Sequence, residues 1–255
     1  CESSIDTDAP EAKFCVKTNN PADSSLAMAG HVVTVNITAD EPVTTPSVVC
    51  NGNSFAVTAV GGSGGFATDF VATYTVQEGD ADGAIVCTVD DFTDAAGNDG
   101  SASVDTEEEE CEAFIDNTPP AAEYCAKSNN ANDATLATVG DVVTVTVTSV
   151  DPITVPTVTC NGISYTIASG QSGDTVFTAT HTVAQSDPNG LVTCAVTFED
   201  LAGNDGTATL SVTEDCRTTI DTDAPTAEFC VKTDNANDAT LATPGDVVRV
   251  EITAD

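Results

Sequence analysis

The chain has 255 residues and a formal net charge of −35, from 41 acidic and 6 basic side chains. A charge of this sign and size repels nucleic acids and anionic lipid surfaces, which excludes both as electrostatic partners. No apolar run is long enough to cross a bilayer, and no apolar stripe follows helical spacing. The sequence therefore predicts neither direct membrane insertion of this segment nor helices.

A 15-residue segment occurs three times and divides the chain into repeats, at residues 1–15, 111–125 and 216–230. Each copy begins with Cys, carries Ile-Asp four and five residues later, and ends on a second Cys. Because the segment is rich in Pro, Asp and Asn, it is typical of a junction between repeated units. We expect the end of a preceding repeat at 1–4, unit one at 5–114, unit two at 115–219, and the N-terminal part of a third unit at 220–255.

The predicted strands follow each junction in the same order. The first lies around 14–16, and the strongest signal follows at 31–38, where Val or Ile alternates with polar residues as in a half-buried strand. The step Glu41-Pro42-Val43 ends this pairing. Further strands of unit one are expected at 47–50, 55–57, 70–76, 84–89 and 102–104, with equivalents in unit two. Seven short strands with turn signals between them predict an all-β fold of tandem immunoglobulin-like (Ig-like) β-sandwiches.

The ten cysteines recur at corresponding places and form no Cys-x-x-Cys metal or redox pattern. They favour disulfides formed in an oxidising compartment, so the protein is expected to be secreted, extracellular or on the cell surface. One cysteine pair per unit lies on strands that are antiparallel neighbours in an Ig-like sandwich. The sequence predicts the disulfides Cys50–Cys87 and Cys160–Cys194.

Two schemes remain for the other six cysteines. The junction scheme pairs Cys1–Cys15, Cys111–Cys125 and Cys216–Cys230, whereas the unit scheme pairs Cys15–Cys111 and Cys125–Cys216. The constant 14-residue step favours the junction scheme, and so does the opposite-pole placement of an early cysteine on the first strand and a late one on the last. Against it, 14 extended residues span roughly 45–50 Å, whereas a disulfide joins Cα atoms about 5.5–6 Å apart. The junction scheme is the one expected, with the unit scheme open.

Four motifs together resemble the bacterial-type Ig-like repeats of giant surface adhesins and related microbial extracellular fibre proteins. They are Ile-Asp-Thr-Asp-Ala-Pro, Gly-Asp-Val-Val-x-Val, an acid-Pro-aliphatic step and Asp-x-Ala-Gly-Asn, found for example at 5–10, 140–145, 151–153 and 94–98. The resemblance covers essentially the whole chain. It implies a linear array of sandwiches, stiffened by Ca²⁺ at the junctions between them.

Acidic residues gather in three segments that an Ig-like sandwich brings to one pole: the N-terminal junction and two loops. Ca²⁺ takes six to eight oxygen ligands and tolerates irregular geometry, so it fits such a cluster. In unit two the site is weaker, because Thr118 and Val150 replace Asp8 and Asp40. The alternative is that these residues only form turns, with Asp94 and Asn98 bonding their own backbone. The candidate ligands are Asp6, Asp8, Asp40, Glu41, Asp94, Asn98, Asp99, Asp116, Asp151, Asp200, Asn204, Asp221 and Asp223.

Other chemistry has little support in the sequence. Asn36-Ile37-Thr38 is a glycosylation sequon, and Asn36 falls on the outward phase of its strand. His31 aligns with Asp141, and His181 aligns with Tyr74. A catalytic group would not be replaced in a sister repeat, so both histidines are expected to be structural or surface residues. No catalytic motif is present, and we expect no enzyme activity.

These features predict a structural segment of a long extracellular fibre, filament or cell-surface stalk. Repeats in which each unit contacts only its neighbours make extended rods. The expected partners are the neighbouring repeats of the same chain and identical chains in a filament. The alternative is an adhesin whose repeats bind a glycan or a protein; it ranks second because aromatic residues make up only 5% of the chain and fall mostly in core phase.

Overall fold

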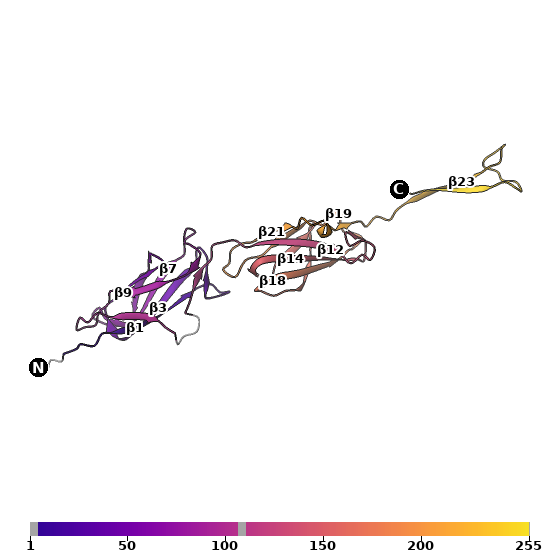
Figure 1. The fold of residues 1–255 in the computed structure, drawn as a ribbon. Helices are drawn as coiled ribbons and strands as arrows, with labels where there is room; N and C mark the ends of the chain where they lie inside the picture. Colours follow the sequence, from indigo (N-terminus) through magenta and orange to yellow (C-terminus); the bar gives the residue numbers. More distant parts are fainter. Residues whose placement is uncertain (1–4, 107–110, 255) are drawn as a thin grey trace.

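The computed structural model describes residues 5–106 and 111–254, and Figure 1 shows two Ig-like sandwiches in a row followed by a hairpin. The molecule is elongated, and the final hairpin turns the chain back toward unit two (Figure 1). The strands of unit one are β1 (Glu11–Thr18), β2 (Leu26–Ala27), β3 (Val32–Val43), β4 (Ser47–Cys50), β5 (Asn53–Ser54), β6 (Ala56–Val60), β7 (Ala67–Thr75), β8 (Gly83–Ala84), β9 (Cys87–Asp90), β10 (Ser101–Val104) and β11 (Phe114–Ile115).

Two sheets enclose the core of unit one. The larger has the order β10-β1-β3-β7-β6 and the smaller the order β5-β4-β9. On β3, Val33, Val35 and Ile37 are buried while the residues between them face outward, which confirms the alternation seen in the sequence. Regular pairing of β3 with β7 breaks between Thr38 and Val43, around Pro42.

Unit two repeats this topology, with sheets β17-β18-β14-β12-β21 and β16-β15-β20. Its two sheets bury Phe177 at the position that Phe70 takes in unit one. The elements are β12 (Ala121–Ser128), β13 (Leu136–Ala137), β14 (Val142–Ile153), β15 (Thr157–Cys160), β16 (Ile163–Ser164), β17 (Thr166–Ser169), β18 (Asp174–Thr182), β19 (Gly190–Leu191), β20 (Cys194–Thr197), β21 (Thr207–Leu210), the one-turn 3₁₀ helix η1 (Glu214–Cys216) and β22 (Thr219–Ile220).

The boundaries between units lie slightly later than the sequence suggested. A small third sheet, β2-β11-β8, places β11 on unit one, and Ile115 packs into the core of that unit. Likewise, β22 joins β13 and β19, and Ile220 packs into the core of unit two. Ile115 and Ile220, which the sequence analysis assigned to the start of the next unit, thus each pack with the core of the preceding sandwich.

After unit two, β23 (Ala227–Thr233) and β24 (Val248–Ala254) form a two-stranded hairpin. Phe229 pairs with Ile252, the same register as Phe14 with Ile37 in unit one. Phe229 is 74% exposed, whereas Phe14 is buried. The hairpin thus has the strand pairing of the first part of a sandwich. Among the described residues, no helix is long and apolar enough to cross a membrane.

Within residues 5–106 and 111–254 the structure has four disulfides. Cys50–Cys87 and Cys160–Cys194 join β4 to β9 and β15 to β20, as the sequence predicts. The other two, Cys15–Cys111 and Cys125–Cys216, follow the unit scheme, with Cα atoms 4.6 and 4.5 Å apart.

The expected junction scheme is therefore wrong for Cys15, Cys111, Cys125 and Cys216. The reason lies in β1, which begins at Glu11, so that Cys15 falls in its second half rather than near its start. Because β1 and β10 are parallel and Phe14 pairs with Val104, both strands run toward the same pole, and Cys111 follows β10 there. Cys230 is free and exposed, so its predicted bond to Cys216 does not form, and Cys1 lies outside the described residues.

Candidate metal site at the N-terminal pole

Three acidic side chains of unit one converge at the pole where the chain enters the sandwich. Asp6 comes from the junction, Glu41 from the end of β3, and Asp94 from the loop between β9 and β10. One carboxylate oxygen of each lies within 4.8 Å of the others. Within residues 5–106 and 111–254, no other group of three acidic, Cys or His side chains meets this criterion. The structure thus brings together one predicted ligand from each of the three segments.

Asp94 is held rigidly at the base of this cluster. Its side chain is 2% exposed and accepts hydrogen bonds from the backbone N–H of Gly97 at 2.6 Å, and from the backbone and side-chain amides of Asn98 at 2.8 and 2.7 Å. Burial works to raise the pKa of Asp94, but the Asn98 and backbone hydrogen bonds outweigh it and the pKa is lowered. These bonds are the turn contacts that the sequence offered as an alternative to metal binding. They keep Asp94 ionised, as a metal ligand must be.

Glu41 lies among several negatively charged side chains. Burial raises the pKa of Glu41, and the charges of Asp94 and Asp6 raise it further. Asn98 also donates from its side chain to the backbone oxygen of Asp6 at 3.4 Å, which ties the junction to the loop. Three converging oxygens with mutual repulsion fit a hard divalent cation such as Ca²⁺, which would remove that repulsion.

The equivalent residues of unit two lie where the two sandwiches meet. Burial raises the pKa of Asp116, a bond from the Thr118 amide opposes this, and the charges of Asp200, Asp82 and Asp151 raise it again. Asp82 belongs to unit one and was missed by the sequence analysis. The sequence did contain a pattern that could have identified it: a polar residue precedes β8 and β19 at the same position, Asp82 in unit one and Asn189 in unit two.

The remaining predicted ligands have other contacts. Asp8 donates its backbone amide to the Asp6 carboxylate at 3.2 Å, and Asp40 accepts from the backbone amide of Glu11 at 2.9 Å. Asp99 is exposed beside its bridge partner Thr93.

In unit two, Asn204 repeats the contacts of Asn98, donating to Asp200 at 2.8 Å and to the backbone oxygen of Asp116 at 2.9 Å. Asp221 accepts from the backbone amide of Asp223, and Asp223 accepts from the Asn189 side chain at 2.9 Å. Asn36 is exposed on β3.

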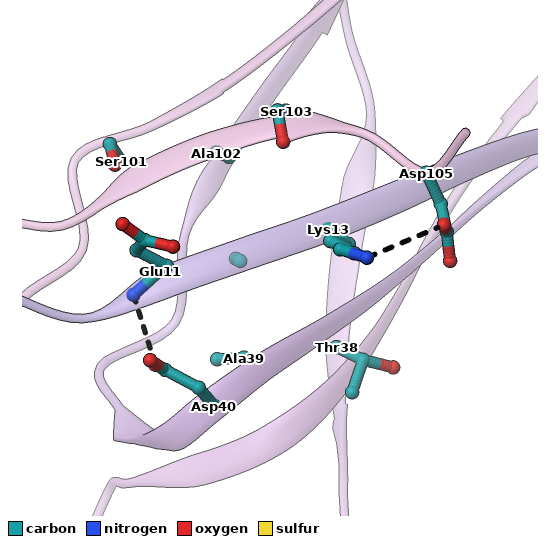
Figure 2. Close-up of a pocket in the computed structure, with 10 residues that line it drawn as sticks. Glu11, Lys13, Thr38, Ala39, Asp40, Ser101, Ala102, Ser103 and Asp105 are labelled. Carbon is teal, nitrogen blue, oxygen red and sulfur yellow. Dashed lines mark hydrogen bonds and ion pairs between the residues drawn. The ribbon is translucent and has the colours of Figure 1, made fainter. Parts of the chain in front are cut away.

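An open hollow of about 570 Å³ lies beside Asp40, over β1, β3 and β10 (Figure 2). Small residues such as Ala39 and Ala102 line it, and Lys13 forms an ion pair with Asp105 at 3.9 Å along its rim. A hollow of about 370 Å³ lies at the same place in unit two. The repetition shows that both hollows follow from small side chains at equivalent positions of the fold.

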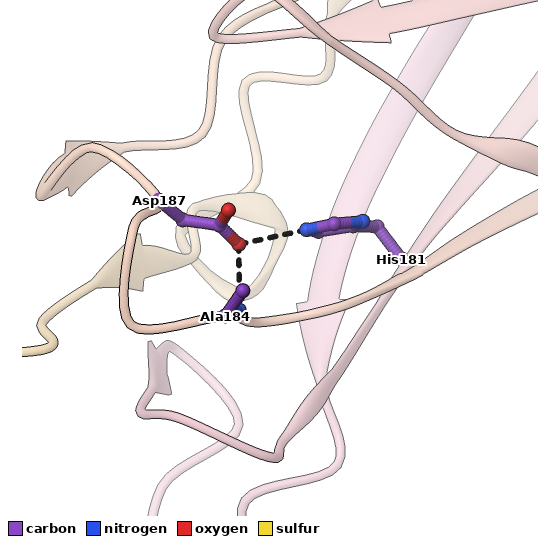
Figure 3. Close-up of polar contacts among 3 residues, drawn as sticks. All are labelled: His181, Ala184 and Asp187. Atoms are coloured by element: carbon purple, nitrogen blue, oxygen red, sulfur yellow. Dashed lines mark hydrogen bonds and ion pairs between the residues drawn. The ribbon is translucent and has the colours of Figure 1, made fainter.

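His181 makes a structural contact in unit two (Figure 3). Its Nε2 lies 2.7 Å from Oδ2 of Asp187, which also accepts from the Ala184 backbone amide at 2.8 Å, and its ring packs on Tyr165 with centroids 5.1 Å apart. Burial works to raise the pKa of Asp187, but the bonds from Ala184 and His181 outweigh it and the pKa is lowered. These contacts fix the loop between β18 and β19.

No family model matches this chain, and no curated protein resembles its sequence. Similar solved structures are tandem Ig-like or fibronectin-like modules. A 1.5-MDa bacterial ice-binding adhesin is 17% identical, with 90% of this chain and 71% of that chain covered and a TM-score of 0.45. Titin domains I67–I69 are 10% identical (93% and 83% covered, TM-score 0.39), and the fibronectin(III)-like modules of Clostridium thermocellum CbhA are 13% identical (80% and 91% covered, TM-score 0.31). At these identities the likeness concerns the fold alone.

Proposed function

We propose that this chain is a load-bearing segment of a long extracellular fibre, filament or cell-surface stalk built of tandem Ig-like repeats. The observation that carries the proposal is the path of covalent bonds. In unit one Cys15 is bonded to Cys111, 96 residues later, and in unit two Cys125 is bonded to Cys216, 91 residues later. Each bond joins a cysteine near the start of its unit's sequence to one near the end.

A chain pulled at its two ends would therefore transmit tension through the disulfides. The force enters at Cys15, crosses to Cys111, passes along the linker to Cys125 and crosses to Cys216. Most of each sandwich lies outside this path, so its unfolding would lengthen the chain little. A structure that holds its length under load suits a stalk or fibre, and disulfides of this kind persist outside the cell.

The contacts between units also suit a rod. At the first junction, the Asn117 backbone amide donates to Asp82 at 2.7 Å, and the Asn117 side chain bonds Ala29 and Asp80 of unit one. At the second junction, the Thr222 amide donates to Asn189 at 2.8 Å. The equivalent linker residues Asn117 and Thr222 are thus both hydrogen-bonded to the preceding unit, so successive units are joined in the same way.

Calcium at the junctions is the second part of the proposal. Asp6, Glu41 and Asp94 would hold the ion in unit one, and Asn98 would keep Asp94 in place. A bound Ca²⁺ supplies positive charge that offsets the repulsion between the carboxylates. Calorimetric titration of the full chain with Ca²⁺ checks this: Glu41→Gln should weaken the binding, and Glu123→Gln, at an exposed position of β12 in unit two, serves as the matched control. Equal binding by both variants would remove Glu41 from the site.

The fibre itself is tested on the native protein. Antibodies against unit one should label intact, unpermeabilised cells, and electron microscopy of the released protein should show thin rods. Thiol labelling before denaturation should leave the four disulfide-bonded pairs unmodified. An intracellular protein with reduced cysteines, or compact particles in place of rods, would contradict the proposal.

A further inference from the structure

One polar loop has the same shape in all three repeats and is closed by an asparagine. The side-chain oxygens of Asn20, Asn130 and Asn235 each accept the backbone amide two residues on, at 2.9, 3.0 and 2.9 Å. This leaves the side-chain NH₂ group of each asparagine to find an acceptor. The three repeats differ in where that group goes.

In the second and third repeats the NH₂ group stays within its own unit. Asn130 donates to Oδ2 of Asp141 at 3.0 Å, and Asn235 donates to Oδ2 of Asp246 at 3.2 Å. Each of these oxygens accepts a second bond, for example from the Thr138 backbone amide at 2.9 Å. A carboxylate oxygen has lone pairs for both donors, so the loop is satisfied internally.

Unit one has His31 at the position of that aspartate. The Nδ1 atom of His31 accepts the Met28 backbone amide at 3.3 Å, the same contact that Asp141 makes with Thr138. An accepting imidazole nitrogen has a single lone pair, so His31 cannot also receive Asn20. Asn20 is 6% exposed, and a buried donor without a partner is costly. Its NH₂ group instead crosses the junction to the backbone oxygens of Leu201 and Ala202, at 2.9 and 3.4 Å.

The loop that receives Asn20 fits closely against unit one. Ala202 is 0% exposed, whereas its equivalent in unit one, Ala96, is exposed. Gly203 has φ +105°, and a Cβ added there would lie 3.3 Å from Sδ of Met28. A side chain at position 203 would thus need Met28 to shift by a few tenths of an ångström, and the positive φ also favours glycine there.

We propose that His31 turns the C-terminal pole of unit one into a docking surface for loop 201–203 of the following unit, and so makes this junction a stiff contact that needs no metal ion. With aspartate at this position, as in unit two, Asn130 is retained internally and the pole offers no such donor. The residue at this position thus decides whether the side-chain NH₂ group of the asparagine is used within its own unit or is left for the next one. The inference rests on the observed contact between the units and not on the fibre proposal.

Residual dipolar couplings of the full, isotope-labelled chain in a chelator-containing buffer test this. In the unaltered chain, units one and two should share one alignment tensor, and the Asn20 side-chain amide should show nuclear Overhauser contacts to Leu201. His31→Asp should separate the two tensors and abolish those contacts. Because aspartate already occupies this position in the other repeats, the variant should keep its fold.

Asn20→Ala should separate the tensors as well, while Asn130→Ala is the matched control and should leave them shared. The proposal is overturned if the His31→Asp chain keeps one shared tensor, if the unaltered chain already has two, or if Asn130→Ala separates them. Chelation removes any contribution from the metal site, so a failed calcium prediction would leave this result unaffected.

Discussion

Removing the Cys15–Cys111 disulfide should let unit one unravel under tension. In the unaltered chain this bond joins Cα atoms 4.6 Å apart, so the 96-residue loop between the two cysteines carries no tension. A chain with Cys15→Ala and Cys111→Ala must carry the force through the sandwich itself. Unfolding of unit one should then appear as a discrete increase in chain length.

The size of that increase follows from the disulfides. The inner bond Cys50–Cys87 still hides 37 of the 96 residues, which leaves 59 that can extend. At about 3.3–3.6 Å per extended residue, the expected step is about 195–210 Å. If Cys50 and Cys87 are replaced as well, all 96 residues extend and the step should be about 315–345 Å.

Single-molecule stretching of the full chain, held at its two ends, measures these steps. The matched control is Cys50→Ala with Cys87→Ala alone, because that inner loop lies behind the intact Cys15–Cys111 bond. The control should weaken unit one without adding a step of either size. Steps of this size in the unaltered, oxidised chain would refute the proposed load path.

Three further predictions concern stability, each read from hydrogen exchange of the strand amides. Replacing Cys50 and Cys87 should lower the unfolding free energy of unit one by about 4 kcal/mol on the loop-entropy model, and an unchanged value would contradict this role. Phe177→Ala should destabilise unit two by about 3–5 kcal/mol, whereas the exposed neighbour Val176 should tolerate alanine within about 0.5 kcal/mol. The lowered pKa of Asp187 means that its ionised form stabilises unit two above the unfolded pKa of about 3.9, a contribution lost as the pH falls through the folded pKa. Asp187→Asn should therefore make unit two less stable at neutral pH and its acid unfolding shallower, and parallel pH curves for the two proteins would contradict this.

Local pattern in the sequence was enough to predict the sandwich and one disulfide per unit. The alternation of Val and Ile at 31–38 specifies a strand with one buried face, because side chains on a strand alternate between its two faces. Cys50 and Cys87 could be paired because their strands are neighbours in any Ig-like sandwich. The three acidic segments could be placed at one pole for the same reason, and the structure brings Asp6, Glu41 and Asp94 together there.

The tertiary structure decided what spacing along the chain could not. A constant 14-residue step suggested Cys111–Cys125, yet Cys111 bonds Cys15 because β1 starts early enough to bring Cys15 to the far pole. Ile115 closes unit one rather than opening unit two for a similar reason, since burial depends on which sandwich lies nearest in space.

The sequence by itself therefore determined the repeated β-sandwich, because strand alternation and turn residues act over a few positions. How successive sandwiches join was decided only in three dimensions. His31 stands 170 positions before Leu201, and no local pattern links them. The two units meet where the buried side-chain amide of Asn20 donates to the backbone oxygen of Leu201, because a buried donor needs an acceptor.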